Sequence, residues 1–490
     1  MSDGAKSSEH RDVLIVGAGI SGIDAAWHLQ RRCPDKSWLI LEARDGIGGT
    51  WDLFRYPGVR SDSDMYTLGF PFRPWKGDRS IVDGDAIREY VEETARAFGI
   101  DRNIRFRHKV IRAAWSSAEA RWTLDIEAEG GEARRFTCAF LFLGSGYYDY
   151  AEGYRPTWPG EADYGGRIVH PQHWPEELDY RAKKVVVIGS GATAVTLVPA
   201  LAEQAAHVTM LQRSPTYIVS RPSRDGLARR LQKRLPAGVA ASAIRWKNVL
   251  LGIFFFSRAR RRPDRVKAAI LKLVGDELGP DYDVARHFSP AYNPWDQRLC
   301  LVPDGDLFAA IRAGTVSIAT DGIERFTATG IRLASGTELE ADLVVTATGL
   351  NVRLLGGIDL VVDGEPVNVA DRLSYKGMML SGVPNLALAF GYTNASWTLK
   401  CDLTSRYVCR LLRHMDLHGY VWCVPRLDDA EVERQPMLDF SSSYVRRAGG
   451  SLPSQGPKAP WRVHQNYLKD LAALSLRPVT DGTMKFGRAG

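Results

Sequence analysis

Residues 12–22 read Asp-Val-Leu-Ile-Val-Gly-Ala-Gly-Ile-Ser-Gly, an apolar run that ends in three spaced glycines. Short continuous apolar runs of this kind are typical of buried parallel strands. A helical pattern continues through Leu29, and a second apolar run from Trp38 ends in Glu42, 20 residues after Gly22. Strand, glycine turn, helix, strand and terminal acid in this order predict a dinucleotide-binding βαβ unit.

The three glycines, the helix N-terminus and the terminal acid of this unit each have their own physical role. Gly17 permits the tight turn, Gly19 lets the backbone approach a pyrophosphate, and Gly22 lets the helix pack closely on the strand. The helix N-terminus presents unpaired N–H groups and the positive end of its dipole to the phosphates. Glu42 is expected to accept a hydrogen bond from a ribose hydroxyl.

A second unit of the same kind begins at Lys184, where an apolar run leads into Gly189-Ser-Gly191-Ala-Thr-Ala194. Its next strand ends in Arg213, at the place where the first unit has an acid. An acid there would repel a 2′-phosphate, whereas a guanidinium can bind one bidentately. We therefore expect FAD in the first site and NADPH in the second. The candidate contacts of the second unit are Gly189, Gly191, Thr193, Arg213 and Ser214.

Two further apolar runs end in glycine, one at Gly144-Ser145-Gly146 and one at Thr348-Gly349. Both look like the points at which two-domain flavoproteins pass from one nucleotide domain to the other. The sequence thus predicts an α/β fold with two three-layer, Rossmann-like domains. The FAD domain is expected to be discontinuous, with residues 1–148 and 350–490 on either side of an NADPH domain at 149–349.

Residues 222–290 interrupt the second unit and are expected to form a basic helical insertion. Residues 221–272 hold 15 Lys and Arg against two Asp, although the whole chain has a net charge of only +7. The insertion also contains an apolar run that ends in Phe254-Phe255-Phe256. Two interpretations stay open: the phenylalanines pack onto the host domain, or residues 246–265 form a membrane-interfacial patch. No apolar run is expected to approach the roughly 20 residues that span a bilayer.

The segment 158–175 between the two units contains Gly166-x-x-x-His170-x-x-x-Trp174-Pro175. This spacing resembles the fingerprint of the Baeyer–Villiger monooxygenases, a family of flavoproteins, with Tyr164 in place of the usual Phe. A second stretch, Gly48-Gly49-Thr50-Trp51 through Tyr56-Pro57-Gly58 to Asp62, is similar to another signature of that family and matches every fixed position.

The resemblance implies roles for particular residues. The stretch with Gly49, Thr50 and Trp51 would lie along the flavin, and Asp62 would contact the catalytic arginine. In the third similar stretch, Tyr292–Cys300, that arginine is Arg298. Gln297 departs from the Lys that many relatives carry, which leaves Arg213 to supply the preference for NADPH. A fourth stretch, Gly391–Thr398, would point a helix N-terminus at the flavin, with Thr398 as a contact.

The resemblance also implies the reaction. NADPH reduces the flavin, O₂ adds at flavin C4a, and the resulting peroxide oxygenates ketones to esters or lactones and also oxidises sulfides and thioamides. Arg298 would stabilise the deprotonated, anionic form of this peroxide. The alternative is a flavin monooxygenase that oxygenates only N and S. A flavin disulfide reductase would need a cysteine pair in the first unit, where Cys33 stands alone before Cys138. A non-catalytic flavoprotein would not need Asp62 and Arg298.

Other features limit the partners. The six cysteines include no C-x-x-C pair, and no His or Cys group has zinc spacing. We expect reduced cysteines, no metal, no nucleic-acid partner, and a small-molecule ketone or sulfide as substrate beside O₂. The polar N-terminus has no signal-peptide core, so a cytoplasmic or membrane-peripheral location is expected.

Overall fold

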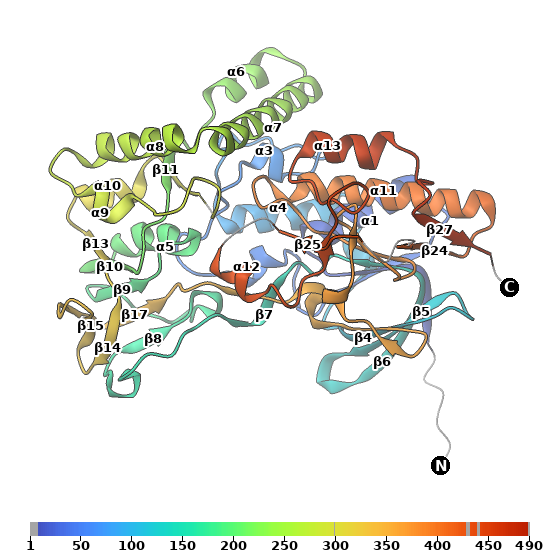
Figure 1. Cartoon of the computed structure of the whole chain (residues 1–490), viewed down its shortest axis with the longest axis horizontal. Coiled ribbons are helices and arrows are strands. Elements are labelled where there is room, and N and C mark those ends of the chain that lie inside the picture. Colours follow the sequence, from blue (N-terminus) through green and yellow to red (C-terminus); the bar gives the residue numbers. More distant parts are fainter. Residues whose placement is uncertain (1–7, 298, 428–431, 439–441, 489–490) are drawn as a thin grey trace.

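Residues 8–297, 299–427, 432–438 and 442–488 are described by the structure, which is a computed structural model. Two β-sheets occupy separate lobes, and Figure 1 shows them on either side of β7 (Tyr148–Gly153). The architecture is α/β with two dinucleotide-binding sheets and a helical insertion, as the sequence predicts.

The first sheet grows from the opening apolar run. β1 (Glu9–Val16) pairs in parallel with β2 (Trp38–Leu41) and β6 (Ala133–Leu143), and residues 13–15 are fully buried. α1 (Ile20–Arg32) follows the glycine turn and packs on α11 (Trp397–His418).

Strands from both ends of the chain complete this sheet. Its order is β20-β19-β4-β5-β6-β1-β2-β3, with β23 paired to β6. Because β19, β20 and β23 follow the second unit in sequence, the first nucleotide-binding domain is discontinuous. The remaining members are β3 (Ile104–Arg105), β4 (Lys109–Ser116), β5 (Arg121–Glu127), β19 (Asp359–Val362), β20 (Glu365–Pro366) and β23 (Leu386–Leu388).

The second sheet is parallel throughout and has the order β13-β10-β9-β17-β8. Its core includes the fully buried Val186, Val187 and Val344. α5 (Ala192–Ala202) and α10 (Asp306–Arg312) pack against each other beside it. The strands are β8 (Arg167–Val169), β9 (Lys184–Ile188), β10 (His207–Gln212), β13 (Val316–Thr320) and β17 (Leu343–Thr346).

Two strands cross between the sheets. β7 leaves the first sheet after β6, and β18 (Leu350–Val352) leaves the second after β17; the two pair antiparallel. The hydroxyl of Thr348 donates to the carbonyl of Tyr154 at 2.6 Å, which ties the crossing strands together. The domain boundaries at residues 148 and 349 stay a prediction.

The basic insertion is helical. It consists of α6 (Gly226–Arg234), α7 (Ala237–Arg261), α8 (Pro263–Leu278) and α9 (Val284–Phe288), and α6, α7 and α8 form the upper edge of Figure 1. α7 corrects one expectation. Over an 18-residue window its mean hydropathy is 1.4, so this 25-residue helix is long and apolar enough to cross a membrane by length and composition alone. In the sequence Arg245 and Lys247 interrupt this apolar stretch, which is why no continuous run of this length is expected from it.

Smaller elements complete the described chain. They are α2 (Thr50–Leu53), α3 (Met65–Leu68), α4 (Gly84–Ala97), β11 (Ile218–Arg221), β12 (Cys300–Pro303), β14 (Ile323–Thr327), β15 (Gly330–Leu333), β16 (Glu338–Glu340), β21 (Ser374–Tyr375), β22 (Met379–Leu380), β24 (Trp422–Pro425), β25 (Gln435–Pro436), α12 (Ser443–Arg447), β26 (Ser454–Gln455), α13 (Tyr467–Leu471) and β27 (Met484–Gly487).

The loop of residues 48–62 connects the two lobes. Gly58 has a φ of +73° and lies so close to α5 that an added Cβ would be 2.7 Å from Ala200 Cβ. Arg60 forms an ion pair with Asp306 at the start of α10, with Nη1–Oδ2 at 2.5 Å. A loop that begins in the first unit is therefore docked on helices of the second.

Gly58→Ala is expected to lower the melting temperature, because the new methyl group would also lie 2.9 Å from the Thr196 carbonyl oxygen. Overpacking of this kind costs about 1–3 kcal/mol. Gly99→Ala is the matched control, since Gly99 has a φ of +66° and nothing within 4 Å of its added Cβ. Thermal unfolding of both variants measures the difference. Equal losses would show that backbone strain, and not the contact with α5, sets the cost.

Candidate functional site

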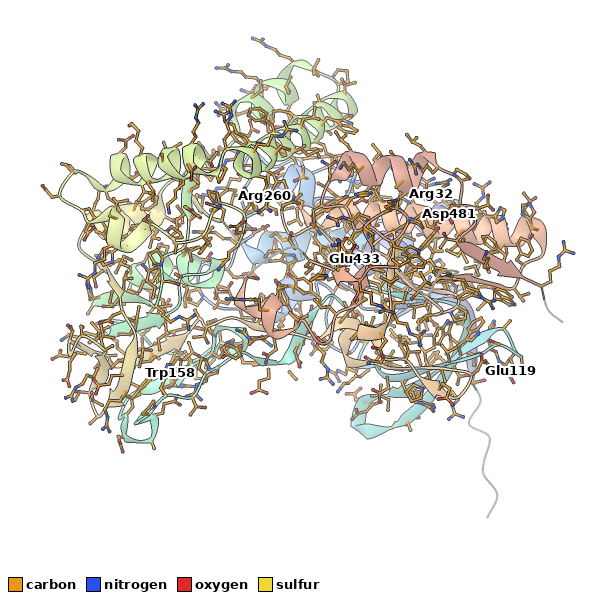
Figure 2. All side chains as sticks on the ribbon, in the orientation of Figure 1. Arg32, Glu119, Trp158, Arg260, Glu433 and Asp481 are labelled. Atoms are coloured by element: carbon orange, nitrogen blue, oxygen red, sulfur yellow. The ribbon has the colours of Figure 1, made fainter. Side chains whose placement is uncertain are left out.

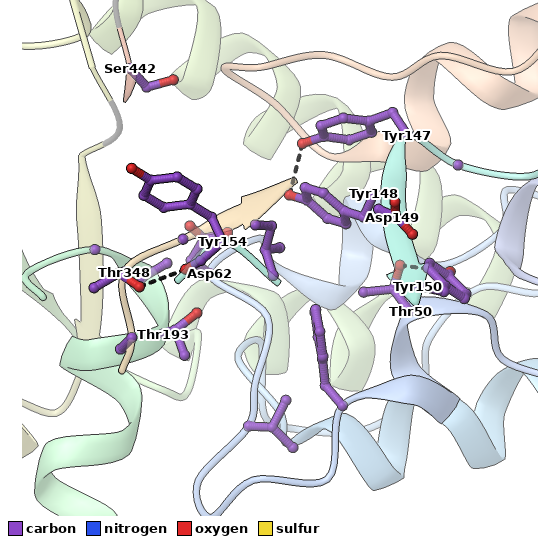
Figure 3. A pocket seen from close by; sticks show the side chains of 18 of the residues that line it. Thr50, Asp62, Tyr147, Tyr148, Asp149, Tyr150, Tyr154, Thr193, Thr348 and Ser442 are labelled. Atoms are coloured by element: carbon purple, nitrogen blue, oxygen red, sulfur yellow. Dashed lines mark hydrogen bonds between the residues drawn. The ribbon is translucent and has the colours of Figure 1, made fainter. Parts of the chain in front are cut away.

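One cavity of about 1530 Å³ lies between the two sheets. Both glycine turns line it, as do the loop of residues 48–62 and the crossing strands. Figure 3 shows part of its wall, with Asp62 and Thr193 on one side and Thr50 and Tyr150 on the other. A single cavity thus joins the two nucleotide-binding turns.

The first turn is shaped for close approach of a ligand to the backbone. Gly17 has a φ of +99°, and an added Cβ would be 2.8 Å from the Gly144 carbonyl oxygen. α1 begins behind Gly19 with no side-chain cap and no acid in its first turn. Its first N–H groups are therefore available to an anion, and the turn fits the pyrophosphate of a dinucleotide.

Glu42 has a structural role that the sequence pattern did not reveal. Its Oε2 accepts a hydrogen bond from the Ala18 N–H at 2.6 Å, and its Oε1 accepts one from the Arg44 N–H at 2.8 Å. Burial raises the pKa of this carboxyl, although the two backbone hydrogen bonds oppose the shift. Glu42 also lines the cavity, and a carboxylate has lone pairs left for a ribose hydroxyl. It both holds the glycine turn and faces the ligand.

The second turn repeats this geometry. Gly189 has a φ of +136°, and an added Cβ would be 2.3 Å from the Ala347 carbonyl oxygen. At Gly191 an added Cβ would meet nothing within 4 Å, so its backbone faces open space. α5 begins directly after Gly191, again without a side-chain cap or an acid in its first turn. Arg213 is exposed and lines the same cavity, so this turn fits a dinucleotide with an extra phosphate.

The loop of residues 48–62 lies between the two turns. Gly19 and Gly49 are in such close contact that a Cβ on Gly49 would be 3.1 Å from the Gly19 Cα. Tyr56 is buried, which raises its pKa to about 12 and keeps its hydroxyl protonated at neutral pH. Asp62 lines the cavity and is partly buried. Arg298 lies outside the described residues, so its predicted partnership with Asp62 stays a prediction.

His170 of the linker pattern is placed at the crossing strands. Its Nε2 donates to the Gly349 carbonyl at 3.3 Å, and its Nδ1 accepts from the Gln172 N–H at 3.2 Å. A Cβ on Gly153 would lie 2.0 Å from the imidazole, so only glycine fits beneath the ring. Burial lowers the pKa of His170, which favours the neutral ring that these two hydrogen bonds require. In the described structure His170 thus contacts both crossing strands and does not line the cavity.

Most predicted contacts meet at the cavity, and two do not. Gly22 sits behind the first turn, where an added Cβ would lie 1.9 Å from the Gly17 carbonyl oxygen. Thr398 is fully buried, and its hydroxyl donates to the Leu68 carbonyl at 2.5 Å. Trp397, one residue earlier in α11, lines the cavity in its place. The predicted residues that line the cavity are Gly17, Gly19, Glu42, Gly49, Thr50, Trp51, Asp62, Gly144, Ser145, Gly189, Gly191, Thr193, Arg213 and Ser214.

A group of tyrosines on β7 and directly before it was not predicted. The hydroxyls of Tyr147 and Tyr148 are 2.8 Å apart, and Tyr150 contacts Thr50 Oγ1 at 3.2 Å, as Figure 3 shows. Tyr147 also stacks on Trp397 with ring centroids 5.2 Å apart. The signal was present, because these tyrosines directly follow Gly144-Ser-Gly146, but tyrosine by itself does not distinguish a cavity wall from a core.

Comparisons with known proteins agree with this geometry. A family model described as FMO-like, flavin-binding monooxygenase-like, matches residues 10–235. FAD-containing monooxygenase EthA of Mycobacterium tuberculosis is 58% identical over 482 residues, which cover 98% of each chain. Two solved structures have the same fold over 98% of this chain and 100% of their own. They are an oxidised steroid monooxygenase bound to NADP, with a TM-score of 0.77 at 21% identity, and an open form of cyclohexanone monooxygenase, with a TM-score of 0.76 at 19% identity.

Proposed function

Because this chain belongs to the flavin-binding monooxygenase-like family, we propose that it is an FAD-containing, NADPH- and O₂-dependent Baeyer–Villiger monooxygenase. Its substrates are small ketones, which it converts to esters or lactones, and sulfides or thioamides, which it oxygenates at sulfur. The observation that carries the proposal is the single cavity into which both glycine turns and Asp62 open. Two dinucleotides bound at these turns would share one reaction space.

FAD, when bound, supplies the redox chemistry that takes a hydride from NADPH and activates O₂. The protein's own residues do the binding and positioning. Glu42 holds the ribose of the flavin nucleotide, and the N-terminus of α1 faces its pyrophosphate. Arg213 binds the 2′-phosphate of NADPH. Arg298 stabilises negative charge that develops in the reaction, and Asp62 orients its guanidinium.

A panel of ketones and sulfides tests the reaction, with NADPH consumption and product mass as the two measurements. We expect esters or lactones from ketones and sulfoxides from sulfides, each with stoichiometric NADPH use. Sulfoxides without an ester from any ketone would assign the chain instead to the monooxygenases that oxygenate only N and S. If no substrate caused NADPH consumption or gave an oxygenated product, the proposal that the protein is an enzyme would be wrong.

The choice of coenzyme is expected to depend on Arg213. Arg213→Ala should weaken NADPH binding by about 2–3 kcal/mol, the range of a charged hydrogen bond, and leave NADH almost unchanged. Arg181→Ala is the control, because Arg181 is an exposed arginine that does not line the cavity. Titration of each variant with both coenzymes measures the effect. An equal loss for NADPH and NADH would mean that Arg213 does not contact the 2′-phosphate.

Arg298 is expected to separate the two halves of the reaction. Hydride transfer needs no cation beside the reacting oxygen, so Arg298→Ala should still consume NADPH. Without that cation the activated oxygen should be released as hydrogen peroxide, with little ester or sulfoxide. Asp62→Ala should have a milder effect of the same kind, because it only misplaces the guanidinium.

Stopped-flow absorbance under oxygen, followed by peroxide and product analysis, measures both steps. Arg312→Ala serves as the control, since Arg312 is paired with Glu277 outside the cavity. A yield of oxygenated product from Arg298→Ala equal to that of the wild type would show that another residue performs this role.

A further inference from the structure

α7 presents an apolar face to solvent. Of the large hydrophobic side chains that are exposed in the described chain, most belong to α6–α8. Phe254 and Phe255 are 58% and 52% exposed, and their rings contact each other edge to face at 5.6 Å between centroids. We define the α7 face as Val239, Trp246, Leu250, Leu251, Phe254 and Phe255, which are all exposed.

α7 cannot rotate to bury these side chains, because other residues along the helix already pack on the protein. Ala240, Ile244 and Val249 are buried against the body of the protein. Arg245 donates to the carbonyls of Tyr66 and Gly69 at 3.1 and 2.8 Å. α7 therefore lies along the surface of the protein, and Figure 1 shows it on the upper edge together with α6 and α8. A helix anchored in this way can lie in an interface but does not span a bilayer.

The sequence left two interpretations of the phenylalanines open: packing onto the host domain, or a membrane-interfacial patch. The structure supports the first for one phenylalanine and leaves two others exposed. Phe256 is partly buried and contacts Trp295 edge to face at 5.6 Å, so it packs onto the host domain. Phe254 and Phe255 do not. Arg260 also points inward: it pairs with Asp296 at 2.6 Å, and Figure 2 labels it between the α7–α8 layer and the body. Only part of the apolar and basic run therefore faces outward.

The surroundings of the α7 face are strongly basic. Within the described residues, the exposed arginines Arg258, Arg261 and Arg262 at the end of α7 form no ion pair. The acids of residues 221–272 are Asp225, which is paired with Lys247, and Asp264. Further exposed cations on the neighbouring helices are Arg229, Arg230, Lys233, Arg234 and Arg265. An apolar centre with a cationic rim matches an anionic lipid surface.

We propose that α6 and α7 bind the surface of an anionic phospholipid bilayer, with the α7 face in the acyl–headgroup boundary and the surrounding arginines at the phosphates. The alternative occupant, a second copy of this chain, fits the charges poorly. A two-fold contact through this face would bring the basic rim of one copy against the basic rim of the other, and like charges in contact oppose association. The binding is independent of the substrate and of the reaction.

Flotation of the intact, FAD-loaded protein with vesicles tests the proposal. Wild-type protein is expected to float with phosphatidylcholine–phosphatidylglycerol vesicles, to stay unbound with pure phosphatidylcholine, and to dissociate in high salt. The double variant Phe254→Ser, Phe255→Ser is expected to lose at least about ten-fold in affinity, because two rings no longer enter the interface. Arg261→Gln with Arg262→Gln is expected to lose about twenty-five-fold, roughly five-fold for each cation near the surface.

Matched controls separate this surface from general hydrophobicity and charge. Leu417 and Leu476 are 81% and 78% exposed and lie outside the insertion, so their replacement by Ser should leave flotation unchanged. Arg167→Gln with Arg181→Gln removes two exposed cations elsewhere and should also have no effect. Absence of wild-type flotation, or equal flotation of the serine variant, would overturn the proposal. The proposal would also be overturned if light scattering showed a dimer for the wild type and a monomer for the Phe254→Ser, Phe255→Ser variant. The α7 face would then be a contact between copies.

Discussion

His170 lies where the chain passes twice between its nucleotide-binding sheets. Its imidazole packs on Gly153 of one crossing strand and donates to the Gly349 carbonyl at the start of the other. Burial lowers the pKa of the ring and so favours the neutral form, in which one nitrogen donates and the other accepts. Because each sheet carries its own glycine turn, the relative position of the two turns depends on how these strands are held. Even a methyl group at residue 153 would displace the ring, because a Cβ there would lie 2.0 Å from it.

The loop of residues 48–62 adds a second constraint on the same geometry. It begins against Gly19 of the first turn and ends on α5 and α10 of the second unit, through Gly58 and the Arg60–Asp306 ion pair. A segment fixed at both ends can hold Asp62 in the cavity with little freedom. The arrangement explains why a pattern of glycine, tryptophan, tyrosine and aspartate spans so few residues. Each residue type has a different neighbour: Gly49 contacts the backbone of Gly19, and Asp62 lines the cavity.

Charge is divided between two regions of the molecule. Residues 221–272, most of which belong to the insertion, carry a surplus of 13 positive charges in a chain whose total is +7, so the rest of the chain is net acidic. The nucleotide-binding turns need little of this charge, because uncapped helix N-termini offer backbone N–H groups to phosphates, and Arg213 lines the same cavity. The basic residues are concentrated instead on helices that lie on the outside, beside exposed phenylalanines. This separation allows one region to bind nucleotides and another to contact an anionic surface.

The sequence by itself determined the two nucleotide units, the approximate positions of their strands and helices, the discontinuous first domain and a set of predicted contacts, most of which line the cavity. The nucleotide units follow from local signals: apolar runs, glycines that need unusual backbone angles, and charges at fixed spacing. The discontinuous domain and the contacts in residues 49–62 follow from the resemblance to known flavoproteins. The starts of β2 and β9 coincide with the predicted ones, while β1 starts earlier and α1 ends later than expected.

Only the tertiary structure decided which side of an element a residue faces. It placed Thr398 in the core and Trp397 at the cavity, exposed Phe254 and Phe255 but packed Phe256, and gave Glu42 its second role at Ala18. It also showed that His170, which the sequence places in a linker pattern, contacts both crossing strands. The reason is physical: burial and hydrogen bonding of a side chain depend on atoms that are remote along the chain. His170 and Gly349 are 179 residues apart.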